Sequence, residues 1–181
     1  MTKVKVKTML YPFLITLIGA VVMMGMLLLP YASANDEYVE HLLKHKDKMY
    51  VEEIGMTYED AVDISLVEFI RIYAEAAEQE LQKDTCIACI VIICIFAGLT
   101  VFTLLMSLLK KPIGIIIFDL LAIGVFKIIH YDFEDRGVIP NGSYDWGIAS
   151  YLTYIVGIII IAGAVWLFIE KRKAKKVAKS E

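Results

Sequence analysis

The chain lacks the patterns by which most enzymes bind nucleotides, metals or acyl groups. It contains no phosphate-binding loop, no G-x-G-x-x-G fingerprint, no H-E-x-x-H zinc motif and no G-x-S-x-G nucleophile elbow. Histidine and cysteine each occur three times in 181 residues. We therefore expect a protein that is not an enzyme, requires no cofactor and does not bind nucleic acid.

Charged residues are missing from three long apolar segments, and a fourth carries two. About 20 helical residues cross the hydrocarbon core of a bilayer, so each segment is long enough to span it as a helix. The composition is 59% hydrophobic, with a mean hydropathy of +0.66. The sequence predicts an all-α integral membrane protein with a single four-helix membrane domain over residues 1–181. The predicted spans are 9–29, 86–109, 113–130 and 148–169.

The charges divide between the two sides that these spans define. One side holds the N-terminus, the connection between the second and third spans, and the basic tail 170–181. The other side, residues 31–85 and 131–147, carries 18 acidic and 6 basic residues. The positive-inside rule predicts that both termini are cytoplasmic, in a multi-pass protein of the plasma membrane. The basic residues are Lys3, Lys5, Lys7, Lys110, Lys111, Lys171, Arg172, Lys173, Lys175, Lys176 and Lys179.

Ala32-Ser33-Ala34 resembles the small-residue site at which signal peptides are cleaved. The preceding apolar run, 9–29, has the length of a complete span, whereas the apolar part of a signal peptide is about 7–15 residues long. Pro30 is consistent with the end of a helix. We therefore expect the first span to be retained, and cleavage after Ala34 is the alternative.

Residues 35–84 form the largest segment outside the membrane. Asn35 or Asp36 can cap a first helix, Gly55 can end it, and T-Y-E-D at Thr57 resembles a capping box that begins a second. No glycine or proline lies between Thr57 and Ala97, so the second helix is expected to continue into the second span. The sequence predicts an extracytoplasmic helical hairpin.

An apolar stripe recurs at three- and four-residue steps along the second outer helix, which is helical periodicity. Two helices alone bury little apolar surface. The stripe therefore indicates packing against the first outer helix, the loop 131–147, another copy of the chain or a partner protein. Its residues are Tyr58, Val62, Leu66, Phe69 and Tyr73. Pro140-Asn141-Gly142-Ser143 predicts a turn within the second outer loop.

Glu37, His41 and His45 are spaced four residues apart and share one face of a helix. Two histidines one turn apart beside a carboxylate can bind Zn²⁺. Lys44 and Lys46 would oppose a cation there, so the other interpretations are a pH-sensitive contact and a solvated helix face.

Cys86 and Cys89 form a C-x-x-C at the outer end of the second span. Such a pair can be redox-active. No βαβ pattern surrounds it, however, and cysteine is also a common small buried residue. Packing is the alternative interpretation.

Asp119 is the most unusual residue of the spans. It lies six residues, about 9 Å, into the third span, at a depth where an ionisable group is costly and faces the bundle interior or a wet cavity. Lys127 and His130 follow near the same helix face. Asp119 could be a structural hydrogen-bonding group or part of an ion or proton path.

A long first outer loop, a short second one, a tight inner connection and a basic tail resemble the layout of claudin-type tetraspan proteins. The paired loop cysteines and tryptophan motif of that family are absent. The best hypothesis is a non-enzymatic interaction, accessory or sensor subunit. Its partner would be a second copy or another membrane or envelope protein. The alternatives are a small ion channel or transporter subunit using Asp119, and a thiol redox protein using Cys86 and Cys89.

Overall fold

The computed structural model describes residues 2–79 and 81–177, with side chains from residue 9 onward. The chain is mostly helical, as the composition predicts. Three of its helices are long and apolar enough to cross a membrane, which agrees with a membrane protein. These helices are α4 (Lys83–Leu108), α5 (Pro112–Asp135) and α6 (Ile148–Val177).

Helix α1 (Thr2–Gly25) contains a shorter described apolar part, Met9–Gly25. A count of three candidate spans therefore applies to the part of the chain that the structure describes. The fourth span remains a prediction.

The chain divides into two compact units. We call the first the bundle unit; it comprises residues 2–24, 97–124 and 153–177. We call the second the sheet unit; it comprises residues 25–96 and 125–152. Both contain parts of the long helices, but the strands lie in the sheet unit.

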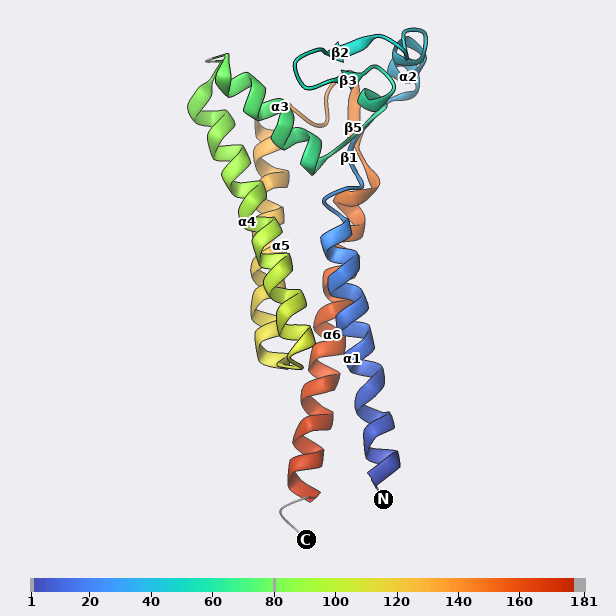
Figure 1. Ribbon diagram of the computed structural model, residues 1–181, viewed down its shortest axis with the longest axis vertical. Coiled ribbons are helices and arrows are strands. Elements are labelled where there is room, and N and C mark those ends of the chain that lie inside the picture. Colours follow the sequence, from blue (N-terminus) through green and yellow to red (C-terminus); the bar gives the residue numbers. More distant parts are fainter. Residues whose placement is uncertain (1, 80, 178–181) are drawn as a thin grey trace. The chain divides into compact units, whose positions relative to one another are not determined.

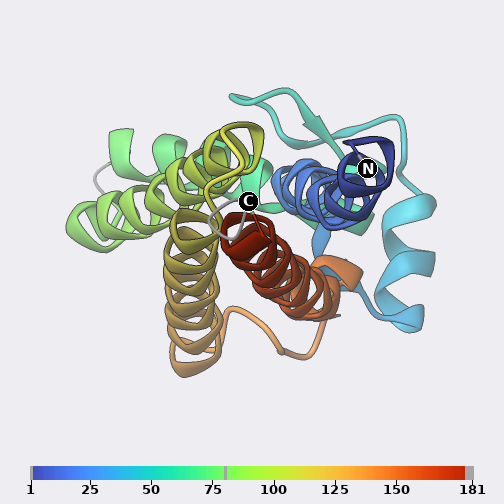
Figure 2. The ribbon, with the colours of Figure 1, turned by 90° about the horizontal axis from the view of Figure 1, so that it is seen from below.

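Helices α1 and α6 approach closely in the bundle unit at two glycines (Figures 1 and 2). A Cβ on Gly19 would lie 2.6 Å from Ile160, and one on Gly163 would lie 2.8 Å from Ile15. Either distance would force the neighbouring side chain to move. Glycine therefore permits the close backbone approach by which helices associate in lipid.

The turn from α4 to α5, also in the bundle unit, closes as a Schellman motif. Lys110 adopts a left-handed conformation with φ of 54°. Its N–H donates to the Ser107 carbonyl at 2.9 Å, and the Lys111 N–H donates to the Met106 carbonyl at 2.9 Å. These bonds satisfy carbonyls that the end of a helix leaves without partners. The tight connection therefore has a defined geometry.

A three-stranded antiparallel sheet organises the sheet unit, with β1 in the middle (Figure 1). Ala32 lies opposite Ile64 on one side and opposite Trp146 on the other. The sheet joins three segments that are distant in sequence. Its strands are β1 (Pro30–Ala34), β4 (Asp63–Ser65) and β5 (Tyr144–Trp146).

Gly147, directly after β5, lies against the backbone of β1. Its N–H donates to the Tyr31 carbonyl at 2.9 Å. A Cβ here would lie 2.4 Å from the carbonyl oxygen of Pro30. No side chain fits at that distance from a backbone atom, so the pairing of β1 with the segment after β5 requires glycine.

Tyr31 is the centre of the aromatic core of the sheet unit. It is fully buried, and four rings meet it edge-on. Their centroids lie 5.4 Å away for Phe133, 5.6 Å for Phe126 and Trp146, and 6.4 Å for Phe69. Edge-to-face contacts at these separations are favourable.

Residues 35–84 differ from the predicted helical hairpin. Two helices are present, but β2 and β3 pair antiparallel between them, with Gly55 at φ +65° in the turn, and β4 joins the three-stranded sheet. Strands of two or three residues are too short to produce a recognisable alternation in the sequence. The elements are α2 (Asp36–Leu43), β2 (Met49–Val51), β3 (Met56–Thr57), η1 (Asp60–Val62) and α3 (Leu66–Glu78).

The helix caps explain where these elements begin. The predicted cap at Asn35 is confirmed, since its side chain accepts from the Tyr38 N–H at 2.9 Å. Thr57 and Asp60 make the reciprocal bonds of a capping box, but the helix that follows, η1, is only three residues long and has Glu59 as its N-cap, without a side-chain bond. The capping box of α3 is Ser65 with Glu68.

The second outer helix does not continue into α4, so that prediction was wrong. Helix α3 ends at Glu78, and α4 begins at Lys83. Gln82 between them has φ of 46°, a left-handed conformation that a helix interior cannot contain. The absence of glycine and proline concealed the break, because glutamine can also adopt this conformation at a cost.

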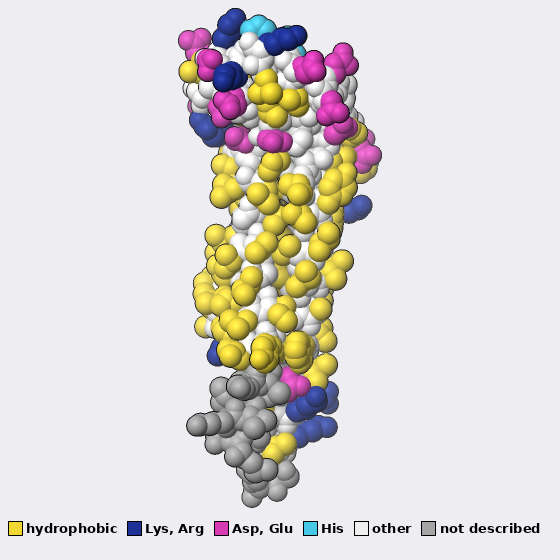
Figure 3. Space-filling view, turned by 90° about the vertical axis from the view of Figure 1, so that its right-hand side faces the viewer, with side chains coloured by type: hydrophobic (Ala, Val, Ile, Leu, Met, Phe, Trp, Pro, Cys, Tyr) yellow, Lys and Arg dark blue, Asp and Glu magenta, His cyan; other side chains and the backbone are white. Residues whose placement is uncertain are grey.

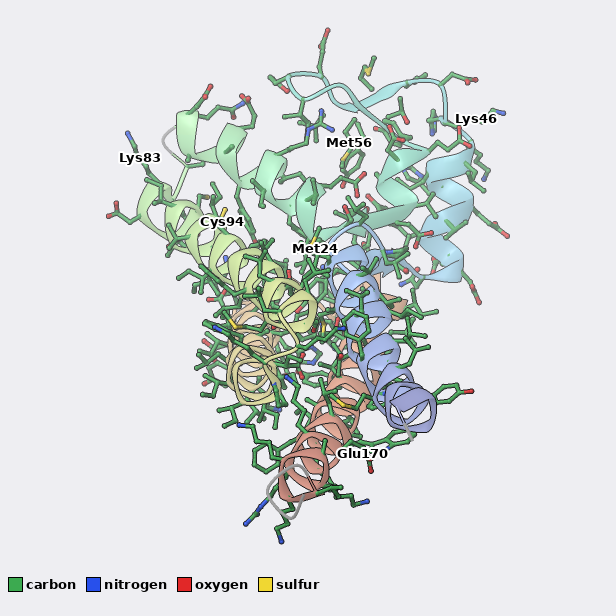
Figure 4. The ribbon with its side chains drawn as sticks, turned by 60° about the horizontal axis from the view of Figure 1, so that its bottom comes forward. Met24, Lys46, Met56, Lys83, Cys94 and Glu170 are labelled. Atoms are coloured by element: carbon green, nitrogen blue, oxygen red, sulfur yellow. The ribbon has the colours of Figure 1, made fainter. Side chains whose placement is uncertain are left out.

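A second small core lies under the β2–β3 pair. Leu42, Met56 and Ala61 are buried together, and the rings of Tyr38, Tyr50 and Tyr58 pack on them. Met56 points into the unit, whereas Lys46 beyond α2 points outward (Figure 4). Segment 35–84 therefore has its own core.

Candidate functional site

Asp119 is fully buried in the bundle unit, and neither of its carboxyl oxygens has a hydrogen-bond partner among the described residues. Burying a carboxyl without a partner is costly, more so in ionised form. The role of Asp119 stays a prediction.

The hydroxyl groups of the bundle unit do not satisfy Asp119. Thr16, Thr100 and Thr103 donate to carbonyls three or four residues earlier on their own helices, at 2.8–3.0 Å. Ser107 donates to the Thr16 carbonyl at 3.4 Å and joins α4 to α1. These four hydroxyl groups therefore bond to backbone carbonyls. The carboxyl of Asp119 receives no hydrogen bond from a described residue.

Lys127 and His130, predicted to accompany Asp119, belong to the sheet unit. Lys127 is exposed. His130 stacks on Trp146 with ring centroids 3.7 Å apart and an interplanar angle of 14°. The contacts of these two residues therefore belong to the sheet unit, whereas Asp119 belongs to the bundle unit.

Arg136 is the polar centre of the sheet unit. Its Nε donates to Asp132 at 3.1 Å, and its terminal nitrogen donates to the same carboxylate, to the Tyr73 hydroxyl at 3.2 Å and to Cys89 Sγ at 3.1 Å. The Cys89 thiol also lies 3.6 Å from Asp132. This cluster, which we call the Arg136 cluster, joins α3, α4 and α5.

The electrostatics of the Arg136 cluster favour the charged guanidinium. Burial acts to lower the pKa of Arg136, but the hydrogen bonds to Asp132 and Tyr73 outweigh it and raise the pKa above its ordinary value. Burial raises the pKa of Tyr73 to about 12, although the Arg136 bond opposes this. The cluster is a satisfied network at neutral pH, which is typical of a structural role.

The sequence reasoning missed the Arg136 cluster. The signal was present: Asp132 and Arg136 are four residues apart, the spacing of an ion pair on a helix. Their contact with Tyr73 and Cys89 carried no signal, because the partners lie 63 and 47 residues away in sequence.

The C-x-x-C thiols have separate environments. Cys86 and Cys89 are buried and unpaired with each other, and Cys94 is exposed. Cys86 Sγ lies 3.4 Å from the Leu81 carbonyl, whereas Cys89 belongs to the Arg136 cluster. The packing interpretation accounts for both positions, and redox activity stays a prediction.

The candidate metal residues form part of an aromatic row instead. His41 stacks on Tyr38 at 5.9 Å between centroids and contacts the ring of His45 at 5.5 Å, and His45 contacts Tyr58 at 5.8 Å. Glu37 is exposed. Within residues 2–79 and 81–177, no group of three or more His, Cys, Asp or Glu side chains is arranged to hold a metal ion.

The predicted interaction stripe is covered by the chain itself. Leu66, Phe69 and Tyr73 are buried, and the rings of Phe69 and Tyr73 contact Phe133. Tyr58 and Val62 pack on the small core described above. Of the occupants that the sequence left open, the segment 131–147 and the first outer helix together cover the stripe.

The exposed surface of segment 35–84 is rich in carboxylates. Figure 3 shows Asp and Glu side chains gathered on one face of the sheet unit. Among the described residues of this unit, one ion pair forms, Arg136 with Asp132, so the exposed carboxylates have no cationic partner, although Asp60 and Asp63 accept hydrogen bonds from Thr57 and Ser33. We call this the acidic surface; its residues are Asp36, Glu37, Glu40, Asp47, Glu52, Glu53, Glu59, Asp60 and Asp63.

Comparison with known proteins adds no relative. No family model matches the chain, and neither a curated protein nor a solved structure is significantly similar to it. The function must therefore be argued from the residues of this chain.

Proposed function

We propose that the protein is a four-span subunit of the plasma membrane that acts by binding a partner rather than by catalysis. In this proposal both termini are cytoplasmic, and the sheet unit faces the outside. The charge asymmetry supports the orientation, since 18 of 24 charged residues in the two predicted outer segments are acidic. Three candidate spans supply the membrane anchor.

The position of Ala32-Ser33-Ala34 supports retention of the first span. The tripeptide lies in β1, paired on one side with β4 and on the other with β5. Cleavage after Ala34 would remove this middle strand together with Tyr31, the centre of the aromatic core. An uncut chain keeps the sheet complete, and α1 is then the fourth span.

The acidic surface carries the proposal for the partner. The apolar stripe is buried by the chain itself, so the surface offered to a partner is polar and negative. Complementary charge accelerates association and excludes partners of like sign. We infer that the partner presents a basic segment and belongs to another membrane or envelope protein, because a second copy would present the same negative surface.

A crosslinking experiment in intact cells tests this function. The variant Glu37→Gln/Glu40→Gln/Glu52→Gln removes three exposed carboxylates, and Lys44→Gln/Lys46→Gln/Lys48→Gln is the matched control on the same segment. We expect the carboxylate variant to lose a crosslinked partner that the lysine variant retains, with salt weakening the contact. Equal crosslinking by both variants, or the absence of a partner band, contradicts the proposal.

Asp119 supports a second candidate, a small channel or transporter subunit. A fully buried carboxyl whose two oxygens have no partner among the described residues is an available ligand for a cation or proton. Ion flux in proteoliposomes should then fall in Asp119→Asn and persist in Asp84→Asn, which changes an exposed acid at the start of α4. Flux that does not exceed that of empty liposomes, or that Asp119→Asn leaves unchanged, contradicts this candidate.

The third hypothesis, thiol redox activity of Cys86 and Cys89, gains no specific support. Both thiols are buried, and each has its own neighbour. Titration of the folded protein with a thiol reagent would measure their reactivity; rapid modification of both would favour this hypothesis over packing.

A further inference from the structure

A hollow of about 590 Å³ lies in the bundle unit, where α5 begins and α6 nears its end. Four of its lining side chains are cationic: Lys111, Lys171, Arg172 and Lys175. Figure 4 shows this end of α6, with Glu170 labelled. The hollow therefore carries a concentrated positive charge.

Within residues 2–79 and 81–177, no acidic side chain lines this hollow. The nearest acid in sequence, Glu170, pairs with Lys173 at 3.0 Å, and Lys173 is not one of the four lining cations. Four like charges repel one another unless an anion lies between them. The hollow therefore attracts an anion that accepts several hydrogen bonds, such as a phosphate.

The walls of the hollow are held together within the bundle unit. The Lys171 ammonium donates to the carbonyl of Lys110, in the Schellman turn between α4 and α5. This bond ties the end of α6 to the residue next to Lys111. Lys111 from the α4–α5 turn and the three cations of α6 are thus presented by a built site rather than by an unattached tail.

Apolar side chains line the same hollow. Ile113 is 59% exposed and Phe168 is 40% exposed, and both lie beside the cations. The apolar run of α5 begins at Ile113, and that of α6 ends at Ile169, so the hollow lies at the level where both apolar runs meet charged residues. That boundary is where lipid headgroups lie against a membrane protein. A soluble anion has no apolar group to pack against Ile113 and Phe168.

We propose that this hollow binds the phosphate headgroup of an anionic phospholipid, with the acyl chain against Ile113 and Phe168. The proposal does not depend on the partner-binding function. It differs from a general attraction of the basic tail to the membrane, because it requires the side chains of the hollow and not the tail charge as a whole.

Native mass spectrometry of the full chain tests the proposal, with phosphatidylglycerol and phosphatidylcholine as probes. The variant Lys111→Gln/Arg172→Gln removes two lining cations. The control Lys173→Gln/Lys176→Gln removes the same charge outside the hollow. We expect the lining variant to lose retained phosphatidylglycerol about tenfold, because it removes two of the four cations that would contact the bound phosphate. The control should change by less than about twofold.

Three results would overturn the proposal. Equal losses in the two variants would indicate diffuse attraction. Equal retention of phosphatidylcholine and phosphatidylglycerol would exclude recognition of charge. Displacement of phosphatidylglycerol by millimolar inorganic phosphate alone would indicate a soluble anion. If the double variant fails to fold, Arg172→Gln against Lys173→Gln makes the same comparison with one charge.

Discussion

Acidic side chains have opposite surroundings in the two units: Asp132 of the sheet unit is partly exposed and paired, whereas Asp119 of the bundle unit is fully buried. In the sheet unit, Asp132 accepts from Arg136, and Arg136 also donates to Tyr73 and Cys89. In the bundle unit, both oxygens of Asp119 lack partners among the described residues. The comparison shows that the sheet unit pairs its partly exposed acid with a cation, whereas the bundle unit buries a carboxyl to which no described residue donates a hydrogen bond.

The largest expected effect tests the backbone contact of the sheet unit. Gly147→Ala places a methyl group 2.4 Å from the Pro30 carbonyl oxygen and 3.0 Å from the carbonyl carbon of Tyr31. Backbone atoms in a paired strand cannot move aside as a side chain can, so we expect a loss of about 3 kcal/mol or more in the free energy of unfolding. Denaturation in detergent, followed by Trp146 fluorescence in a Trp166→Phe background, measures it.

Gly142→Ala is the matched control, because a Cβ there meets nothing within 4 Å. Its stability should change by less than about 0.5 kcal/mol. Equal stability of the two alanine variants would contradict the close approach of Gly147 to β1.

The next largest effect is expected when Asp132 loses its partner Arg136. Arg136→Leu leaves Asp132 without its cation and Tyr73 without its donor, and we expect a loss of about 2 kcal/mol, moderated because both charged side chains are partly exposed. The double variant Arg136→Leu/Asp132→Leu should recover part of the loss. A double variant less stable than both single ones would show that the pair is not the main interaction. Thermal unfolding in detergent provides the comparison.

Replacing the unpaired acid, Asp119, should change the free energy of unfolding in the opposite direction. Asp119→Leu replaces a buried carboxyl that lacks partners with an apolar side chain of similar size, so the free energy of unfolding should rise by about 1–2 kcal/mol. The corresponding change Asp132→Leu should lower it. Destabilisation by Asp119→Leu would mean that a bound group satisfies the carboxyl, which would favour the channel or transporter candidate.

A smaller effect is the pH dependence of stability that Tyr73 gives to the sheet unit. The pKa of Tyr73 is raised to about 12 in the folded chain, above an unfolded value of 10.0, so the folded state holds its proton more tightly. Stability from this group is complete below pH 10 and is lost as pH rises toward 12. We expect wild type to lose about 1–2 kcal/mol more than Tyr73→Phe over that window. Parallel pH profiles for the two proteins would contradict the burial of the Tyr73 hydroxyl.

Local signals in the sequence were sufficient where the formation of an element depends only on residues within one segment. Long uncharged runs predicted α4 and α6, and the apolar run 113–130 predicted most of α5. The Asn35 cap follows from a side chain that bonds three residues away. The predicted turn at Asn141 is confirmed, since its side chain accepts from Ser143 and Tyr144 at 2.8 Å.

Local signals were misleading where two segments compete or cooperate. Thr57 and Ser65 both begin patterns that make capping bonds, and only the second begins a helix longer than one turn. The intervening β4 forms because β1 pairs with it, a contact across about 30 residues. No window along the chain contains both strands, so the helical hairpin was the simplest interpretation and was incomplete.

The apolar helices and the distribution of charge follow from the sequence alone. Both depend on composition along single segments, and the hydrocarbon length and the cost of charge in lipid act on each segment separately. The tertiary structure alone decided that Ala32-Ser33-Ala34 is a central strand, that the apolar stripe is covered, that Arg136 has partners and that Asp119 has none in the described chain. Each of these depends on which distant residues pack together, and packing is a property of the folded chain.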